Sequence, residues 1–316
     1  MKVFITGGSG FIGTRIIPLL VSNGHEVIGL SRSETSDKIL NELGCKTTIR
    51  GKIEDSSLLE KTASTVDAVI HLAFNLDGFG SDPTYDYFKE SIVASEAILH
   101  LAKGLSSSEN KSKDKILINT SGILGGAIAG FNSENLLSEK DIFETPQRPD
   151  YYSKISIDYP NLKNIVIRLS PIVYGKGEKG FLKNLILISK LNGFVGYLNQ
   201  GLNKWTSIHV NDAAEIYVKA LEKNKETNIY HALSSKDGFK IKDLSITLSG
   251  KLNLPLRSIE TSGDGQESIK VFGPFISMVL PLDIPASNDL TREKLGWEPK
   301  ELDLLDELNK NDFYFA

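Results

Sequence analysis

The feature that most constrains this chain is a glycine-rich turn near its start, Thr6–Gly13, with the sequence Thr-Gly-Gly-Ser-Gly-Phe-Ile-Gly. The turn follows the short apolar segment Val3–Thr6 and precedes a segment whose apolar residues have helical spacing. In that context Gly7 permits a tight turn, Gly10 leaves room for a pyrophosphate, and Gly13 lets helix and strand pack closely. The helix N-terminus adds amide donors and partial positive charge. The turn therefore predicts a dinucleotide site built from main chain; the alternative is a sharp strand-to-helix turn that binds nothing.

Short apolar segments recur along the first half of the chain, with helical spacing between them. This alternation predicts an α/β fold, a Rossmann-type doubly wound parallel sheet. After residue 169 the pattern loosens, because glycines and prolines interrupt it. We therefore expect an NAD(P)-binding Rossmann domain over residues 1–169 and a smaller C-terminal substrate-binding lobe over 170–316, with some segments returning to the Rossmann domain. The predicted strands are Val3–Thr6, Val27–Leu30, Ala68–Leu72, Lys115–Asn119 and Ile165–Leu169.

Composition excludes several other kinds of protein. The 36 basic and 40 acidic side chains give a net charge of -4, so no broad positive field exists for nucleic acid. Cys45 is the one cysteine, which excludes an internal disulfide, and the scattered histidines predict no metal site. No apolar run reaches the roughly 18 residues of a spanning helix, and none resembles a signal sequence. We expect a cytoplasmic protein that works away from membranes.

The residues after the second predicted strand bear on the choice of dinucleotide. An acidic residue there would bind the ribose of NAD, but this chain has Ser31, Arg32 and Ser33. A guanidinium fork flanked by two hydroxyls suits the 2′-phosphate of NADP. The alternatives are a surface arginine and a ribose contact from Glu34. NADP is thus the predicted cofactor, with NAD as the second choice.

Four further segments accompany the glycine turn: His71–Ala73, Asn119–Gly122, Arg168–Gly175 and Ile208–Ala214. With them the chain resembles, over most of its length, the extended and atypical short-chain dehydrogenase/reductase families, often described as NAD-dependent epimerase/dehydratase. The resemblance implies that Leu72 and Ala73 line the cofactor path and that Pro171, Ile172 and Val173 border the nicotinamide. The full predicted cofactor-binding set is Thr6, Gly7, Gly10, Phe11, Ile12, Gly13, Ser31, Arg32, Ser33, Leu72, Ala73, Thr120, Pro171, Ile172 and Val173.

The resemblance also implies catalytic residues. The family uses a serine that polarises a carbonyl and a tyrosine whose phenol exchanges a proton, helped by a lysine four residues later. Ser121 matches the serine by its position, although such a residue can also be a strand-end hydroxyl that caps a turn. Tyr151 and Tyr152 are the candidate proton donors, but Lys154 follows Tyr151 by three residues. That spacing still shares a helix face; the ordinary alternative is an exposed lysine beside packed aromatics.

Two positions depart from the family pattern. Lys52 and Ile53 follow Gly51, where the family commonly has an acidic residue at the adenine edge. Ser91 aligns with the asparagine or aspartate that organises the family's proton relay. Adenine recognition and proton supply are therefore expected to differ from the family's usual scheme.

The predicted function is an NADP-dependent oxidoreductase that reduces a small aldehyde or ketone by hydride transfer. An epimerase or dehydratase that keeps its cofactor is the second hypothesis, and a non-catalytic, dinucleotide-binding redox sensor is the third. The resemblance implies a homodimer as one assembly. The second lobe carries aromatic residues that form either an apolar substrate pocket or the lobe's own core: Tyr174, Phe181, Phe194, Tyr197 and Trp205.

Overall fold

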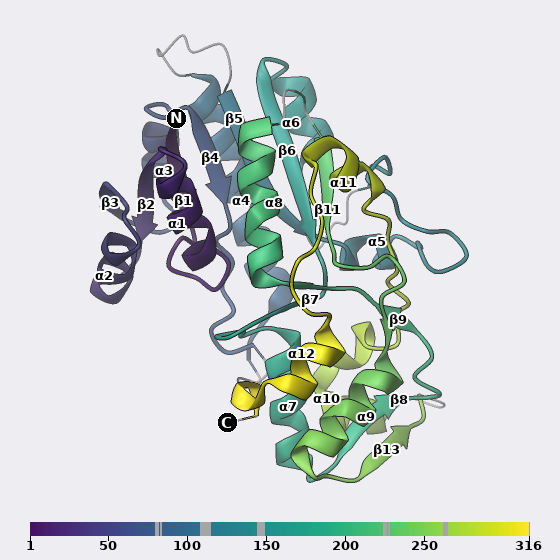
Figure 1. Ribbon diagram of the computed structural model, residues 1–316. Helices are drawn as coiled ribbons and strands as arrows, with labels where there is room; N and C mark the ends of the chain where they lie inside the picture. Colours follow the sequence, from purple (N-terminus) through teal and green to yellow (C-terminus); the bar gives the residue numbers. More distant parts are fainter. Residues whose placement is uncertain are drawn as a thin grey trace.

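A seven-stranded parallel sheet forms the centre of the molecule (Figure 1). The computed structural model describes residues 1–79, 82, 84–107, 115–143, 149–223, 226, 228–261 and 265–315. The strand order is β11-β6-β5-β4-β1-β2-β3. The strands are β1 (Lys2–Thr6), β2 (Glu26–Ser31), β3 (Thr47–Arg50), β4 (Ala68–His71), β5 (Lys115–Gly122), β6 (Leu162–Leu169) and β11 (Asn228–Ala232).

Helices cover both faces of this sheet, which is why its strands are almost continuously apolar. On one face Ile16 of α1 and Tyr217 of α8 pack over Ile5. On the other, Leu59 of α3 and Leu101 of α4 pack over Phe4. The covering helices are α1 (Gly13–Ser22), α2 (Glu34–Glu42), α3 (Ser56–Ala63), α4 (Tyr87–Ser106), α6 (Tyr152–Asp158) and α8 (Val210–Lys223).

The strand order reverses direction between β1 and β4, and this reversal positions the site. Thr6 at the end of β1 pairs with His71 at the end of β4. From that point successive connections run to opposite edges of the sheet, which leaves a crevice at the carboxyl ends of the strands. The predicted Rossmann-type fold is confirmed.

A smaller lobe lies below the carboxyl edge of the sheet in Figure 1 and has its own hydrophobic core. It is built from β7 (Ile172–Tyr174), α7 (Phe181–Asn192), β8 (Val195–Leu198), β9 (Lys204–Trp205), β12 (Phe239–Lys240), α9 (Ile241–Leu252), β13 (Leu256–Ile259), α10 (Gln266–Val279), α12 (Leu304–Lys310) and the 3-10 turn η1 (Asp312–Tyr314). The short helix α5 (Leu124–Ile128) lies between sheet and lobe, where Leu124 joins the core of the lobe.

The chain returns to the sheet after building part of this lobe. Strand β10 (Ser207–His209) leads into α8, which packs on the sheet beside α1, and β11 then adds the last strand. Helix α11 (Asp289–Leu295) also returns, with Leu295 and Trp297 buried in the same core. No helix in the described part of the chain is both long and apolar enough to cross a membrane.

Two strands of the sheet were not among the predicted ones. β3 is a half-exposed edge strand with two threonines and an arginine, so it lacks a continuous apolar pattern. β11 lies in the region where the local pattern is interrupted, and only its pairing with β6 places it in the sheet.

Candidate active site

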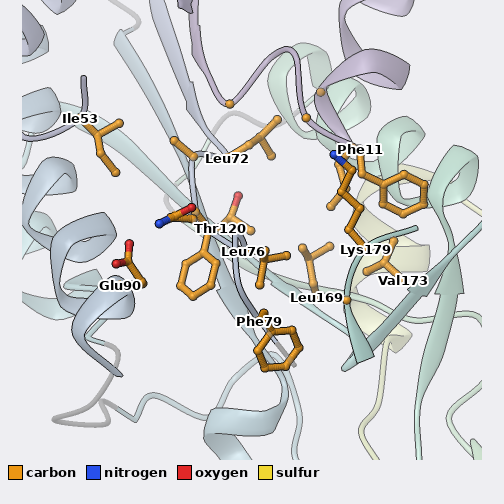
Figure 2. Close-up of a pocket in the computed structure, with 18 of the residues that line it drawn as sticks. Phe11, Ile53, Leu72, Leu76, Phe79, Glu90, Thr120, Leu169, Val173 and Lys179 are labelled. Carbon is orange, nitrogen blue, oxygen red and sulfur yellow. The ribbon is translucent and has the colours of Figure 1, made fainter. Parts of the chain in front are cut away.

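A cavity of about 500 Å³ runs along the carboxyl ends of the strands, between the sheet and the smaller lobe. Figure 2 shows its walls: Phe11 after β1, Leu72 after β4, Thr120 in β5 and Leu169 in β6 all face the same space. Cavities of this size at the switch point of a doubly wound sheet are the usual ligand sites of such folds.

The glycine turn packs tightly against the strand beside it. Gly7 has a φ of +72°, which favours glycine, and a Cβ there would lie 2.7 Å from the amide nitrogen of Ala73. A Cβ on Gly13 would lie 2.5 Å from the carbonyl oxygen of Gly7. Both glycines are therefore required by close packing.

Gly10 differs from these two because it is exposed at the cavity wall. A Cβ there would meet only the carbonyl oxygen of Gly7, at 3.1 Å, and the side chain would project into the cavity. Within the described residues, the main-chain N–H groups of Phe11 and Ile12 have no hydrogen-bond acceptor. Unpaired donors around a glycine at a helix N-terminus fit a diphosphate, so the residues present suit a dinucleotide.

A loop of residues 175–180, which we call the 175–180 loop, lies against the glycine turn. The Arg15 guanidinium donates to the main-chain oxygen of Lys176 over 3.3 Å, and this joins α1 to the loop. Glu178 accepts from the amide nitrogens of Gly180 and Lys183, the latter at 2.8 Å, and so caps α7. Burial raises the pKa of Glu178 to about 7, against the lowering effect of those two amides. The loop is thus anchored at both of its ends.

Lys179 of this loop was not among the predicted residues. Its side chain lines the cavity, and in the view of Figure 2 its amino group lies toward Phe11. A positive charge in this part of the wall would favour a diphosphate at the glycine turn.

We expect Lys179→Ala to weaken NADPH and NADH binding alike, by about threefold to fivefold, because an exposed ion pair contributes up to about 1 kcal/mol. Fluorescence titration of both cofactors would measure the change. Lys176→Ala is the matched control, since Lys176 is exposed in the same loop and does not line the cavity. Equal effects of the two variants would show that Lys179 contributes only general charge.

At the end of β2, Arg32 lines the cavity and forms an ion pair with Asp77, 2.7 Å apart. Both side chains are more than half exposed. Ser31 and Ser33 do not line the cavity: the Ser31 hydroxyl donates to the main-chain oxygen of Ser33, and the Ser33 hydroxyl caps α2. Glu34 opens that helix and lies outside the cavity wall. Arg32 is therefore the charged group that the end of β2 presents to the cavity.

A buried hydrogen-bond network ties the strand ends together behind the cavity. His71 Nε2 donates to the carbonyl oxygen of Ala94 at 2.9 Å, so in the neutral ring Nδ1 accepts from Thr6, 2.7 Å away. The Thr120 hydroxyl donates to the carbonyl oxygen of His71 at 2.7 Å and hence accepts from Tyr217 at 2.8 Å. Thr6, a predicted cofactor-binding residue, is fully buried and does not line the cavity; its hydroxyl joins the end of β1 to His71 at the end of β4.

Ser121 follows Thr120 and faces the cavity with a side chain that is 6% exposed. Its hydroxyl has no hydrogen-bond partner among the described residues. A second, much smaller void lies behind it, bordered by Ala94 of α4 and by Asp150. The serine hydroxyl is thus free to donate to a ligand atom in the cavity.

The structure does not bring the predicted tyrosines and lysine to the cavity. Tyr151 has a φ of 52° and precedes α6, where its ring packs against the core on that face of the sheet. Burial raises the pKa of Tyr152, which is the opposite of what a phenolic base needs. Lys154 donates to Asp158 at 2.8 Å on the exposed side of α6, and that bond raises its pKa. None of these three side chains lines the cavity.

Most of the predicted cofactor-binding residues do line the cavity. Four do not: Thr6, Ser31 and Ser33 make the hydrogen bonds described above, and Ile172 is fully buried in the core of the lobe. Alternation along β7 explains this difference, since Val173 faces the cavity and Ile172 faces away. Those that line it are Gly7, Gly10, Phe11, Ile12, Gly13, Arg32, Leu72, Ala73, Thr120, Pro171 and Val173, together with Ser121.

Several residues that line the cavity were not predicted from the sequence. Leu76 and Phe79 come from the irregular 72–79 segment after β4, and Glu90 comes from the first turn of α4. One general rule could have indicated them: the segments that follow parallel strands lie at the same edge of the sheet, where the cavity is. Among the aromatic residues of the lobe, Phe181 lines the cavity, whereas Trp205 and Tyr174 are fully buried in the core.

Sheet order, glycine turn and cavity together define a Rossmann-type dinucleotide-binding protein. The chain belongs to the NAD-dependent epimerase/dehydratase family, whose model matches residues 3–233. It is therefore an NAD-binding enzyme of the short-chain dehydrogenase/reductase type, as the resemblance implied.

Individual relatives agree with this placement. An uncharacterized protein of Saccharomyces cerevisiae is 33% identical, over 98% of this chain and 99% of its own length. The sterol-4-alpha-carboxylate 3-dehydrogenase, decarboxylating, of Dictyostelium discoideum is 31% identical, over 73% of this chain and 70% of its own. The crystal structure of DesIV, a dTDP-glucose 4,6-dehydratase from Streptomyces venezuelae, superposes with a TM-score of 0.70 at 17% identity, covering 100% and 97% of the two chains.

Proposed function

We propose that this protein is an NADP(H)-dependent reductase that transfers hydride to the carbonyl carbon of an aldehyde or ketone. The observation that carries the proposal is the free hydroxyl of Ser121, which faces one continuous cavity that extends to the glycine turn. The name of the Dictyostelium relative, a 3-dehydrogenase, supports chemistry at a carbonyl or the corresponding alcohol.

When bound, the reduced nicotinamide would supply the hydride. Pro171 and Val173 would border it, and Ser121 would donate a hydrogen bond to the carbonyl oxygen of the substrate. Charge develops on that oxygen as the carbon is reduced, so a fixed donor stabilises the transition state more than the ground state. Tyr151 and Tyr152 lie outside the cavity wall, so we assign the proton that completes the alcohol to water in the cavity.

Nicotinamide absorbance tests this function directly. We expect NADPH to be oxidised in the presence of aldehydes or ketones, with one alcohol formed for each cofactor consumed. An epimerase or dehydratase would form product with no net change in absorbance. Tight NADPH binding without turnover of any carbonyl compound would contradict the proposal and favour a redox sensor.

The choice of NADP rests on Arg32. We expect Arg32→Ala to weaken NADPH binding by roughly tenfold or more, because a charged hydrogen bond contributes about 1.5–3 kcal/mol, and to leave NADH binding nearly unchanged. Asp77→Asn should strengthen NADPH binding, since Asp77 holds the same guanidinium in the structure. Calorimetry with both cofactors measures these changes.

Arg50→Ala is the control for the arginine variant. Arg50, the last residue of β3, is also exposed and forms an ion pair with an aspartate, Asp37 of α2, but it does not line the cavity. Equal losses for NADPH and NADH in the Arg32 variant would contradict the assignment of the 2′-phosphate to this side chain.

A further inference from the structure

Ser121 borders two spaces at once. It lines the large cavity, and it also lines the small void behind it, which has a volume of about 10 Å³. Leu72, Ala73, Phe74 and Thr120 line both spaces as well, so the void adjoins the cavity at the ends of β4 and β5. Figure 2 shows two of them, Leu72 and Thr120, in this shared wall. A volume of this size holds about one water molecule, if the water finds about two to four polar partners.

Ser95 of α4 offers an unpaired hydroxyl to this void. Its side chain is 3% exposed and lines the void but not the cavity. Buried serines in helices often donate back to the carbonyl oxygen four residues earlier, as Ser91 and Ser189 do here, at 2.8 and 2.7 Å. The Ser95 hydroxyl has no hydrogen-bond partner among the described residues, yet its oxygen is not sealed off from open space. It therefore faces the void.

Asp150 also borders the void, and the protein holds it firmly. The side-chain amide of Asn119 donates to its main-chain oxygen at 2.7 Å, and its carboxylate accepts from the amide nitrogen of Tyr152 at 3.1 Å. The fully buried Arg168 lies 3.8 Å from the other carboxylate oxygen. Ser121 and Arg168 are neighbours in the register of β5 and β6, so their side chains leave the same face of the sheet. Asp150 thus lies over the face from which Ser121 projects, with its charge balanced by Arg168.

One water in the void would satisfy the polar groups around it. Ser95 has no acceptor among the described residues, so its hydroxyl donates to the water oxygen. A carboxylate only accepts, so Asp150 takes one hydrogen of the water. The second hydrogen is then left for the Oγ atom of Ser121. Because that oxygen already accepts a hydrogen bond in the void, its own hydrogen points to the cavity.

We propose that this void binds one water and that Ser95 and Asp150, acting through the water, orient the hydroxyl of Ser121 toward the cavity. Both are positioning residues, because neither lines the cavity that takes the ligands. A serine hydroxyl without such a partner rotates and donates to a substrate in only some of its orientations. The role given to Ser121 rests on the proposed reductase function, but the water can be observed without turnover.

A crystal structure of the full chain, at a resolution that shows ordered solvent, tests the water site. We expect one water within about 3.2 Å of Ser95 Oγ, Ser121 Oγ and a carboxylate oxygen of Asp150. In crystals of Ser95→Val this water should be absent, because the larger side chain occupies the void and offers no hydroxyl. A void without water in the unmodified protein, or a water that misses any of the three groups, would overturn the proposal.

Kinetics test the positioning role. Ser95→Ala should lower kcat for carbonyl reduction by about fivefold to tenfold, the loss of about one neutral hydrogen bond, with KM for the carbonyl and the Kd of NADPH changed by less than about twofold. Ser189→Ala is the matched control, since Ser189 is a helical serine, 4% exposed, that lines neither space; its kcat should stay within about twofold. A thermal unfolding scan confirms that both variants are folded.

A double variant shows whether Ser95 acts through Ser121. Adding Ser95→Ala to Ser121→Ala should cause no further loss of kcat, because the water then has no hydroxyl to orient. Losses that multiply, or an unchanged kcat in Ser95→Ala alone, would overturn the positioning role. Failure of the reductase function looks different: the unmodified protein then oxidises NADPH with no carbonyl compound, and the two crystal structures by themselves confirm or overturn the water site.

Discussion

Replacing Ser121 by alanine is expected to lower kcat for carbonyl reduction by about 10²- to 10³-fold, the usual cost of removing a hydrogen-bond donor to a developing oxyanion. The Ser121 hydroxyl has no partner among the described residues and faces the cavity. Its removal therefore deletes an interaction made in the transition state. Steady-state kinetics should show the loss in kcat and in kcat/KM alike, with the Kd of NADPH almost unchanged.

Ser207→Ala is the control for this variant. Ser207 is a similarly buried strand serine, at 8% exposure against 6% for Ser121, but it lies in β10 and does not line the cavity. We expect its kcat to stay within about twofold of the unmodified protein, since it touches neither ligand. A Ser121→Ala variant with full turnover would show that the serine is a structural strand-end hydroxyl.

The second large effect is expected at the glycine turn. Gly10→Val should weaken both NADPH and NADH binding by more than about 100-fold, roughly 2.7 kcal/mol, because the new side chain fills the space beside the unpaired amides of Phe11 and Ile12. The fold should tolerate the change, since Gly10 is exposed and only the carbonyl oxygen of Gly7 comes near its Cβ.

Variants at two other glycines distinguish an effect on cofactor binding from an effect on the stability of the fold. Gly13→Val places a Cβ 2.5 Å from a main-chain oxygen, so this variant should lose folded structure as well as cofactor. Gly250→Ala, with open space around its Cβ in α9, should leave cofactor affinity unchanged and raise the free energy of unfolding by up to about 1 kcal/mol, because alanine favours a helix more than glycine does. Thermal unfolding with and without NADPH measures both effects. Normal cofactor affinity in a folded Gly10→Val variant would place the diphosphate elsewhere.

The sequence predicted the parts of the site that depend on neighbouring residues. The strand, turn and helix around Gly7 are contiguous, so their spacing fixes their geometry, and Arg32 follows directly from the end of a strand. The same reasoning also placed Thr6 and Ser31 in the cofactor site, but neither residue lines the cavity. Position next to the turn or strand end does not reveal that a hydroxyl is already bonded within the protein.

The predicted residues that do not line the cavity lie on elements whose side-chain direction is set by tertiary packing, which the sequence does not reveal. The three-residue spacing of Tyr151 and Lys154 allowed a shared helix face, but α6 begins only after Tyr151, and Lys154 turns to Asp158. Other residues of the cavity wall could not be predicted from the sequence for a related reason. Phe79 belongs to a segment without regular structure, and Glu90 faces the cavity only because of how α4 packs on the sheet.

The return of the chain to the sheet has a consequence for how the protein is made. Tyr217 and Leu221 of α8 complete the apolar layer that begins with Ile16 and Ile17 of α1, and β11 closes the edge beyond β6. While the ribosome is still releasing the middle of the chain, that apolar face and that strand edge are open. The nucleotide-binding half therefore cannot finish folding as an autonomous unit during synthesis, and it waits for residues that are translated after the first strands of the second lobe.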